Sequence, residues 1–214
     1  NKGVAGMIQA DDIVYTRQGF VFSQWSFKPT QKLLLNAGIS LNQQVYEFKS
    51  LMVVNQPLLS RKIQSPISPR FTLNYSLNAN LNLYGIIARG FSTPSLAEIR
   101  PSDGNFYPQL NAEQGWNAEI GIKGSLINDH VLLDVSFYSF QLKNAIVRRV
   151  DLNGNEYFVN AGATKQNGLE AMIKYILVKD SKERKYNIDF TNSFSYQPYQ
   201  FTNYQQGNSV FDGN

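Results

Sequence analysis

The only histidine of the sequence is the first residue to consider for catalysis. His130 follows Asn128 and Asp129 in the segment LINDHV, between two apolar runs. A Ser-His-Asp catalytic group needs its three side chains gathered around a substrate, whereas this setting predicts a tight, solvent-exposed turn. The sequence holds no cysteine, so a metal site with several His or Cys ligands is excluded. No phosphate-binding or dinucleotide-binding glycine motif is present either. We therefore expect no enzyme, no metal site and no cofactor.

A second segment with grouped oxygen ligands is DLNGNE, which runs from Asp151 to Glu156. Its carboxylates and amides could hold calcium, but the longer spacing to a bidentate glutamate of a calcium-binding loop is missing. Asn-Gly between two strand-like runs is a strong hairpin signal. The simpler prediction is a hairpin turn.

The charge of the chain gives no sign of a nucleic-acid-binding surface. The 214 residues carry a net charge of +4. The one dense basic cluster, KDSKERK at residues 179–185, is half diluted by acids and is typical of a solvated turn. No apolar run approaches the roughly 20 residues of a membrane-spanning helix, and no signal peptide is visible at the start. We expect the sequence to be a fragment of a longer chain.

The elements that position these residues are predicted to be strands. Apolar and polar residues alternate with a period of two, as in FTLNYSLN, which indicates strands with two different faces. About eight strands are predicted, at residues 12–28, 31–49, 68–78, 81–91, 115–126, 130–148, 157–178 and 184–198.

The connections between these strands alternate between short and long. An antiparallel meander would then have its short turns at one end and its long loops at the other, as outer-membrane barrels do. A soluble β-sandwich or lipocalin-like barrel would also show alternation. Two features favour the membrane barrel: the polar rows are rich in Asn, Thr, Ser, Gln and Gly, and aromatic residues lie near the strand ends.

An ordered series of motifs resembles the TonB-dependent outer-membrane receptors. It includes SPRFTLNYSLNANLNLYGIIARGFSTPSLAEI, then NAEQGWNAEIGIKGSLINDHVLLDVSFYSFQLKNAIV and NAGATKQNGLEAMIKY, over residues 66–178. The resemblance implies an all-β fold, with the whole of residues 1–214 an antiparallel up-and-down part of a transmembrane barrel of 22 strands. The plug domain and the segment that contacts TonB would lie outside this sequence.

Function follows from the same resemblance. It implies a receptor in the bacterial outer membrane, in contact with lipid, that takes up a scarce nutrient by a TonB-dependent route. A ferric siderophore is the expected small-molecule ligand, ahead of an oligosaccharide or cobalamin. The alternatives are a passive porin or a ligand-binding barrel without energy coupling; an outer-membrane hydrolase would need His130.

Within the motif ARGFSTPS, Gly90 is expected to allow a bend or bulge. Pro94 is expected to end the strand, because proline has no N–H to donate to the ladder.

Residues that could bind the ligand are expected in the long loops, which hold aromatic, amide and arginine side chains suited to an anionic iron chelate or a sugar. The alternative is that they only shape the loops and pack them together. The candidates are Arg89, Arg100, Asp103, Asn105, Phe106, Tyr107, Tyr199 and Tyr204.

Overall fold

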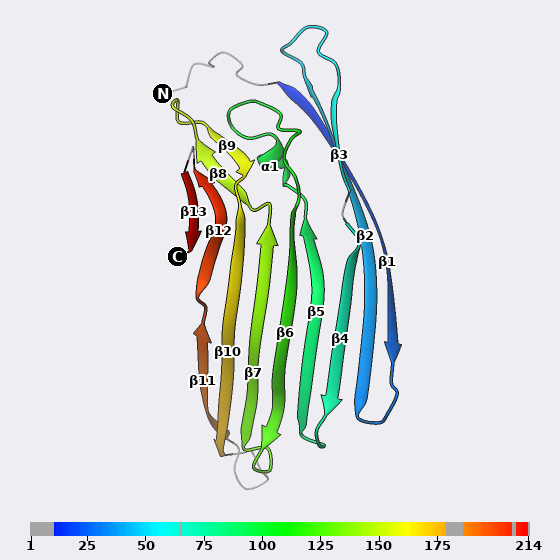
Figure 1. The fold of residues 1–214 in the computed structure, drawn as a ribbon, viewed down its shortest axis with the longest axis vertical. Helices are drawn as coiled ribbons and strands as arrows, with labels where there is room; N and C mark the ends of the chain where they lie inside the picture. The colour runs from blue at the N-terminus through cyan, green and yellow to red at the C-terminus, as the bar shows by residue number, and fades with distance from the viewer. Residues whose placement is uncertain (1–10, 65, 179–185, 207–208, 214) are drawn as a thin grey trace.

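The computed structural model describes residues 11–64, 66–178, 186–206 and 209–213. In this part of the chain nearly all regular structure is β-strand, arranged as one large antiparallel sheet and one small hairpin (Figure 1). The predicted all-β antiparallel meander is confirmed. No helix among the described residues is long and apolar enough to span a membrane.

The main sheet follows the order of the chain. Its successive strands are β1 (Asp12–Phe27), β2 (Leu33–Ser50), β4 (Ser68–Ser76), β5 (Leu81–Ser92), β6 (Glu113–Leu126), β7 (Val131–Lys143) and β10 (Ala163–Val178). Next to β10 lie β11 (Ile188–Tyr196) and then β12 (Tyr199–Gln206), which pair with successive parts of the same strand. The sheet ends with β13 (Ser209–Gly213), and β3 (Leu59–Gln64) pairs with the upper part of β2.

Backbone conformation explains where the strands differ from those predicted. The predicted strand 130–148 stops at Lys143 because Asn144 has a φ of 57°. The predicted strand 157–178 is divided before β10, near Gly162, whose φ is 119°. The residues between form a separate hairpin of β8 (Ile146–Val150) and β9 (Glu156–Asn160).

Two parts of predicted long loops are also strands. One is β3, and the other is the terminal segment, which carries β12 and β13. Each of these strands extends the sheet at the end where the long loops lie (Figure 1).

An unbroken register from β1 to β10 assigns every side chain of these strands to one of two faces. We call them the apolar face and the polar face. The apolar face includes Trp25, Leu35, Ala37, Phe71, Leu73, Ile87, Ile120, Val135, Phe137 and Leu169. The polar face includes Asn36, Thr72, Asn82, Tyr84, Asn117, Glu119, Asp134, Ser136 and Glu170.

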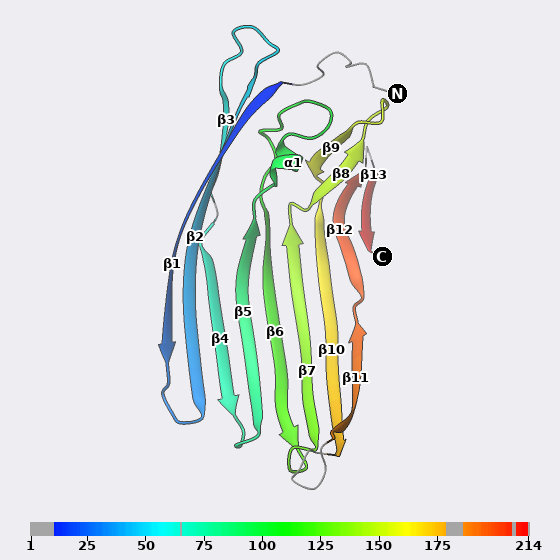
Figure 2. The same ribbon diagram turned by 180° about the vertical axis from the view of Figure 1, so that it is seen from behind.

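Short turns and long loops lie at opposite ends of the sheet, as predicted (Figures 1 and 2). Three short connections, 28–32, 77–80 and 127–130, are described; the fourth predicted turn, 179–185, lies outside the described residues. His130 is exposed in its turn, as expected, with its Nδ1 3.1 Å from the carbonyl oxygen of Ile127.

Aromatic rings on the polar face lie across glycines of the neighbouring strand. A Cβ on Gly121 would fall 2.5 Å from the ring of Tyr84, and one on Gly168 would fall 2.3 Å from the ring of Tyr138. Both pairs are direct cross-strand neighbours. Only glycine leaves the rings this close to the backbone, so they lie flat on the wall of the sheet.

The two edges of the sheet carry unpaired backbone groups. Among the described strands, β1 pairs only with β2, and β13 pairs only with β12. Unpaired strand edges are costly in lipid and promote pairing with other chains in water.

We expect these 214 residues, expressed alone and refolded in detergent, to aggregate or to pair edge to edge. Light scattering coupled to size-exclusion chromatography measures this, and a monodisperse, heat-modifiable monomer would contradict it.

Candidate functional site

The loop that follows β5 folds onto the polar face as an ordered unit, which we call the mouth loop (residues 93–112). Strand β5 ends at Ser92, two residues before Pro94, and the loop then forms the short helix α1 (Leu96–Ile99). Ser95 caps this helix: its hydroxyl accepts from the N–H of Glu98 at 3.3 Å, and its own N–H donates to the Glu98 carboxylate at 2.6 Å. This reciprocal arrangement satisfies two helix-end donors.

A small hydrophobic core anchors the mouth loop to the wall. Ile99 and Leu110 of the loop are buried against Tyr46 of β2 and Ile63 of β3. The Tyr46 hydroxyl also donates to the carbonyl oxygen of Pro94. Because Tyr46 belongs to the polar face, this is the face that the loop covers. We take the polar face as the interior of the barrel wall.

Arg100 joins the mouth loop to the first strand. Its Nε donates to Oδ2 of Asp12 at 2.9 Å, and the two side chains are only 14% and 13% exposed. The guanidinium also lies over the ring of Phe48, 5.6 Å from the centroid, and Phe106 stacks on the same ring at 5.2 Å. Arg100 and Phe106 therefore hold the loop in place, which is the packing role weighed for them from sequence.

Asp103, Asn105 and Tyr107 form a hydrogen-bonded group at the tip of the same loop. Asp103 accepts from the backbone N–H of Asn105 at 2.9 Å, from its side-chain amide at 3.0 Å and from the Tyr107 hydroxyl. Tyr107 in turn stacks on Tyr157 of β9, with centroids 6.4 Å apart. Asn105 is exposed, so this group presents an amide and an aromatic pair at the surface of the loop.

The ionisation of Asp103 is coupled to this group. Burial opposes the charged form, but the hydrogen bonds from Tyr107 and Asn105 outweigh it, so the pKa of Asp103 is lowered from its ordinary value of 3.8.

Tyr199 and Tyr204 lie on β12, beside the upper part of β10. The hydroxyls of Tyr199 and Tyr138 are 2.8 Å apart on the polar face. Tyr204 contacts Phe201, with centroids 5.1 Å apart, and the guanidinium of Arg149 lies over its ring at 5.2 Å. Arg149 was not among the predicted site residues, although it lies in the long connection between the predicted strands 130–148 and 157–178.

Arg89 does not share the face of the other candidates. The register places it beside Trp116 on the apolar face, where its guanidinium donates to Oε1 of Gln114 at 2.7 Å. Gly90 pairs with Gly115 in unbroken register, so the bulge expected there is absent from this described segment. The expectation of a bulge at Gly90 was wrong, because the ladder continues in register to Ser92.

Lower on the polar face, carboxylates line the wall. Together with Tyr84 and Ser136 they line a depression of about 430 Å³. The Tyr84 hydroxyl donates to Glu119 at 3.0 Å, and Gln197 donates to Glu170 at 3.3 Å. Asp134 lies on the same wall, 3.9 Å from Lys123. Sequence reasoning did not single these out, although they occupy polar positions of the alternation.

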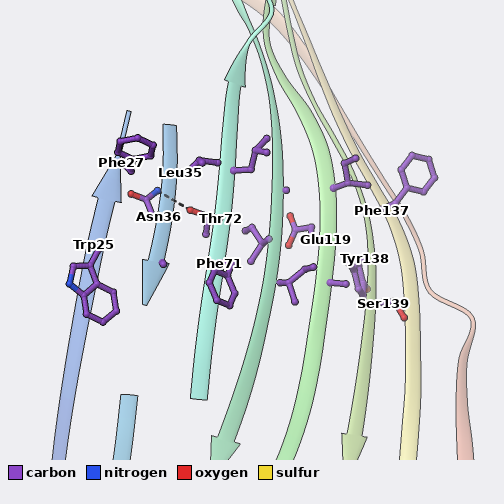
Figure 3. Close-up of a pocket in the computed structure, with 17 residues that line it drawn as sticks. Trp25, Phe27, Leu35, Asn36, Phe71, Thr72, Glu119, Phe137, Tyr138 and Ser139 are labelled. Carbon is purple, nitrogen blue, oxygen red and sulfur yellow. Dashed lines mark hydrogen bonds between the residues drawn. The ribbon is translucent and has the colours of Figure 1, made fainter. Parts of the chain in front are cut away.

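A larger depression lies on the other side of the sheet. It occupies about 800 Å³ between bulky residues of the apolar face, among them Trp25, Phe27, Phe71 and Phe137 (Figure 3). Because its walls are apolar and it faces away from the mouth loop, it is not the candidate ligand site.

The segment from Asp151 to Glu156 is a hairpin turn, as predicted. One carboxylate oxygen of Asp151 accepts from the backbone N–H groups of Asn153 and Asn155, both at 2.8 Å. A hydrogen bond from the Asn155 side chain is the main cause of a lowered pKa at Asp151. Within the described residues, no group of three His, Cys, Asp or Glu side chains is placed to hold a metal ion.

Comparison with known proteins identifies relatives of this fold. A family model described as the β-barrel of TonB-dependent receptor-like proteins matches residues 2–214. The structure is similar to the copper transporter OprC, with a TM-score of 0.67 at 12% identity over 88% of this chain and 32% of that one. It is also similar to the siderophore receptor PiuA from Acinetobacter baumannii, with a TM-score of 0.64 at 16% identity over 94% of this chain and 28% of that one.

A third similar structure is the pyoverdine outer membrane receptor FpvA from Pseudomonas aeruginosa PAO1, bound to pyoverdine. Its TM-score is 0.62 at 18% identity, over 94% of this chain and 27% of that one. The chain therefore spans about a third or less of the length of these solved proteins.

The first prediction concerns the ion pair of Arg100 with Asp12. Arg100→Gln leaves the largely buried carboxylate of Asp12 unpaired. We expect it to lower the free energy that holds the mouth loop on the wall by about 2–3 kcal/mol, less than the loss of one partner costs in a fully buried pair. Arg17→Gln is the matched control, because Arg17 pairs with Glu47 at an exposed site and should cost under about 1 kcal/mol. The rate of limited proteolysis of the mouth loop, measured in the complete protein, compares the two variants. Equal cleavage of the two variants would contradict the prediction.

The second prediction concerns pH. A lowered carboxylate pKa contributes stability that is present above the ordinary value of 3.8 and is lost as pH falls through the lower folded-state value. We expect the tip of the mouth loop to open below about pH 4, seen as faster proteolysis by an acid-active protease. Asp103→Asn removes the titrating group and should flatten that pH dependence. An unchanged profile in this variant would assign the acid sensitivity to another group.

Proposed function

The chain belongs to the TonB-dependent receptor family, and from this premise we propose that it forms part of the wall and outer mouth of a receptor for active nutrient uptake. Its long-loop end would face outward and its short turns the periplasm, as in outer-membrane barrels. The apolar face would contact lipid, and the polar face would enclose the transport path. TonB itself would be contacted through regions outside this sequence.

We propose a ferric siderophore as the nutrient. The observation that carries this is a pair of tyrosine contacts: Tyr107 of the mouth loop with Tyr157 of β9, and Tyr138 with Tyr199 on the polar face. Aromatic surfaces with polar ends give large contact area and hydrogen bonding together. Such groups suit a chelate that presents rings and amides around its iron.

A copper substrate has less support from these residues. Copper favours imidazole, thiolate and thioether ligands. The sequence contains one histidine, no cysteine and three methionines, and His130 lies in the short turn between β6 and β7. The relative described as a copper transporter is 12% identical, a level that supports the fold.

A barrel without energy coupling is the second candidate function. The carboxylate wall around Glu119 and Glu170 would suit a water-filled channel as well as a covered one. Uptake that stops when TonB is deleted supports the receptor. Uptake that persists at the same rate favours the passive barrel.

A third prediction tests the ligand site. Tyr199→Ala removes a ring from the interior side, and we expect it to weaken binding of an iron-loaded siderophore roughly tenfold or more, as for a central aromatic contact. Tyr196→Ala is the matched control, because the register places Tyr196 beside Leu169 on the apolar face.

The measurement is fluorescence quenching of the complete receptor by a panel of iron-loaded catecholate and hydroxamate siderophores, with a copper salt as a further probe. Equal affinity of both variants for every siderophore that binds the native protein would exclude Tyr199 from the site. Binding of the copper salt alone would overturn the siderophore proposal.

A further inference from the structure

Three cations gather on the apolar face at its long-loop end. Arg89 pairs with Trp116, Trp116 with Gln141, and Gln141 with Lys165, so all four side chains lie on one row of that face. Lys143 follows two residues after Gln141 and pairs with Gln114. We call Arg89, Lys143 and Lys165 the rim cations.

The rim cations have no acidic neighbour on their own face. Among the described residues, the positions around them on β6, β7 and β12 hold Gln114, Gln141 and Gln200. Arg89 donates to Gln114, and neither lysine takes part in an ion pair given by the structure. Both lysines are exposed. The carboxylates of the wall, including Glu119 and Glu170, lie on the opposite face.

The two lysines are also close to one another. Lys165 lies opposite Gln141, so Lys143 is its diagonal neighbour across β7 and β10, at roughly 7–8 Å between backbones. Like charges at this separation repel, and an anion between them would remove that cost. Arg89 lies three strand spacings from Lys165, about 14 Å across the sheet. The rim cations can therefore receive more than one anionic group.

Their height on the wall matches a membrane boundary. Below them the same face is built from Ala118, Ile120 and Ile122 on β6 and from Val135 and Phe137 on β7. On β6 this stretch from Trp116 to Gly124 covers eight residue steps, about 27 Å along the strand, or about 20 Å of height at the usual tilt, most of an apolar band about 25 Å tall. Trp116, 46% exposed, lies at the upper border, where interfacial aromatic residues are found.

We infer that the rim cations form a binding site for the phosphate groups of a phosphorylated glycolipid in the outer leaflet of the membrane. Such headgroups lie at the height of Trp116 while their acyl chains contact the apolar residues below. Basic side chains next to a membrane surface bind anionic lipid headgroups in this way. The site also gives the charge of Arg89 an anionic partner, which the neutral amide of Gln114 does not supply. The inference rests on the membrane placement of the barrel and is independent of which nutrient is imported.

The test uses the complete receptor, purified in detergent and titrated with lipid A, followed by native mass spectrometry. The double variant Lys143→Gln/Lys165→Gln should bind lipid A roughly 30-fold more weakly, or about fivefold per cation removed. Adding Arg89→Gln should weaken binding again. Lys28→Gln/Lys32→Gln is the matched control, because both lysines are exposed in the short turn at the other end of the wall.

Three outcomes would overturn the inference. The first is equal binding of lipid A by the native protein and the double variant. The second is equal binding of dephosphorylated lipid A, which would mean that the acyl chains alone hold the lipid. The third is capture of inorganic pyrophosphate as tightly as lipid A, which would point to a soluble anion. Siderophore binding, measured on the same samples, should be unchanged by the double variant, so failure of the lipid site and failure of the nutrient site are distinguishable.

Discussion

Continuous hydrogen bonding between strands is the constraint on which the rest of this structure depends. A buried backbone group without a partner is costly, and in the proposed membrane setting the cost reaches several kcal/mol. The ladder from β1 to β10 is correspondingly continuous, with no shift of register. The register then decides the face of every side chain, since a slip of one residue would exchange the two faces. The separation of Arg89 from the mouth residues, and its grouping with Lys143 and Lys165, follow from this single constraint.

The interior side is under a different constraint. It has to be polar without its own side chains filling the space in front of the wall. Tyr84 and Tyr138 lie flat across Gly121 and Gly168, so two large rings add little height to the wall. Their hydroxyls reach Glu119 and Tyr199 across the sheet. The wall thus carries hydrogen-bonding groups in fixed positions without filling the space in front of it.

Much of the fold was readable from sequence because alternation with a period of two is a direct consequence of strand geometry. The breaks within predicted strands were not readable, since positive φ at Asn144 and the close approach at Gly162 depend on the neighbouring loop and strand. The candidate site was found only as a set of residue types. Whether Arg100 meets a ligand or Asp12 depends on a contact between segments 88 residues apart, and no local pattern carries that information.

The contact of Arg100 with Asp12 also has a consequence for the order of assembly. It joins the first strand of this sheet to a loop that follows the fifth, and contacts of such sequence separation form late because a long chain segment must be closed first. The mouth loop can therefore reach its final position only after β1 to β5 have paired in one sheet. Formation of this ion pair therefore reports that the part of the sheet from β1 to β5 has formed.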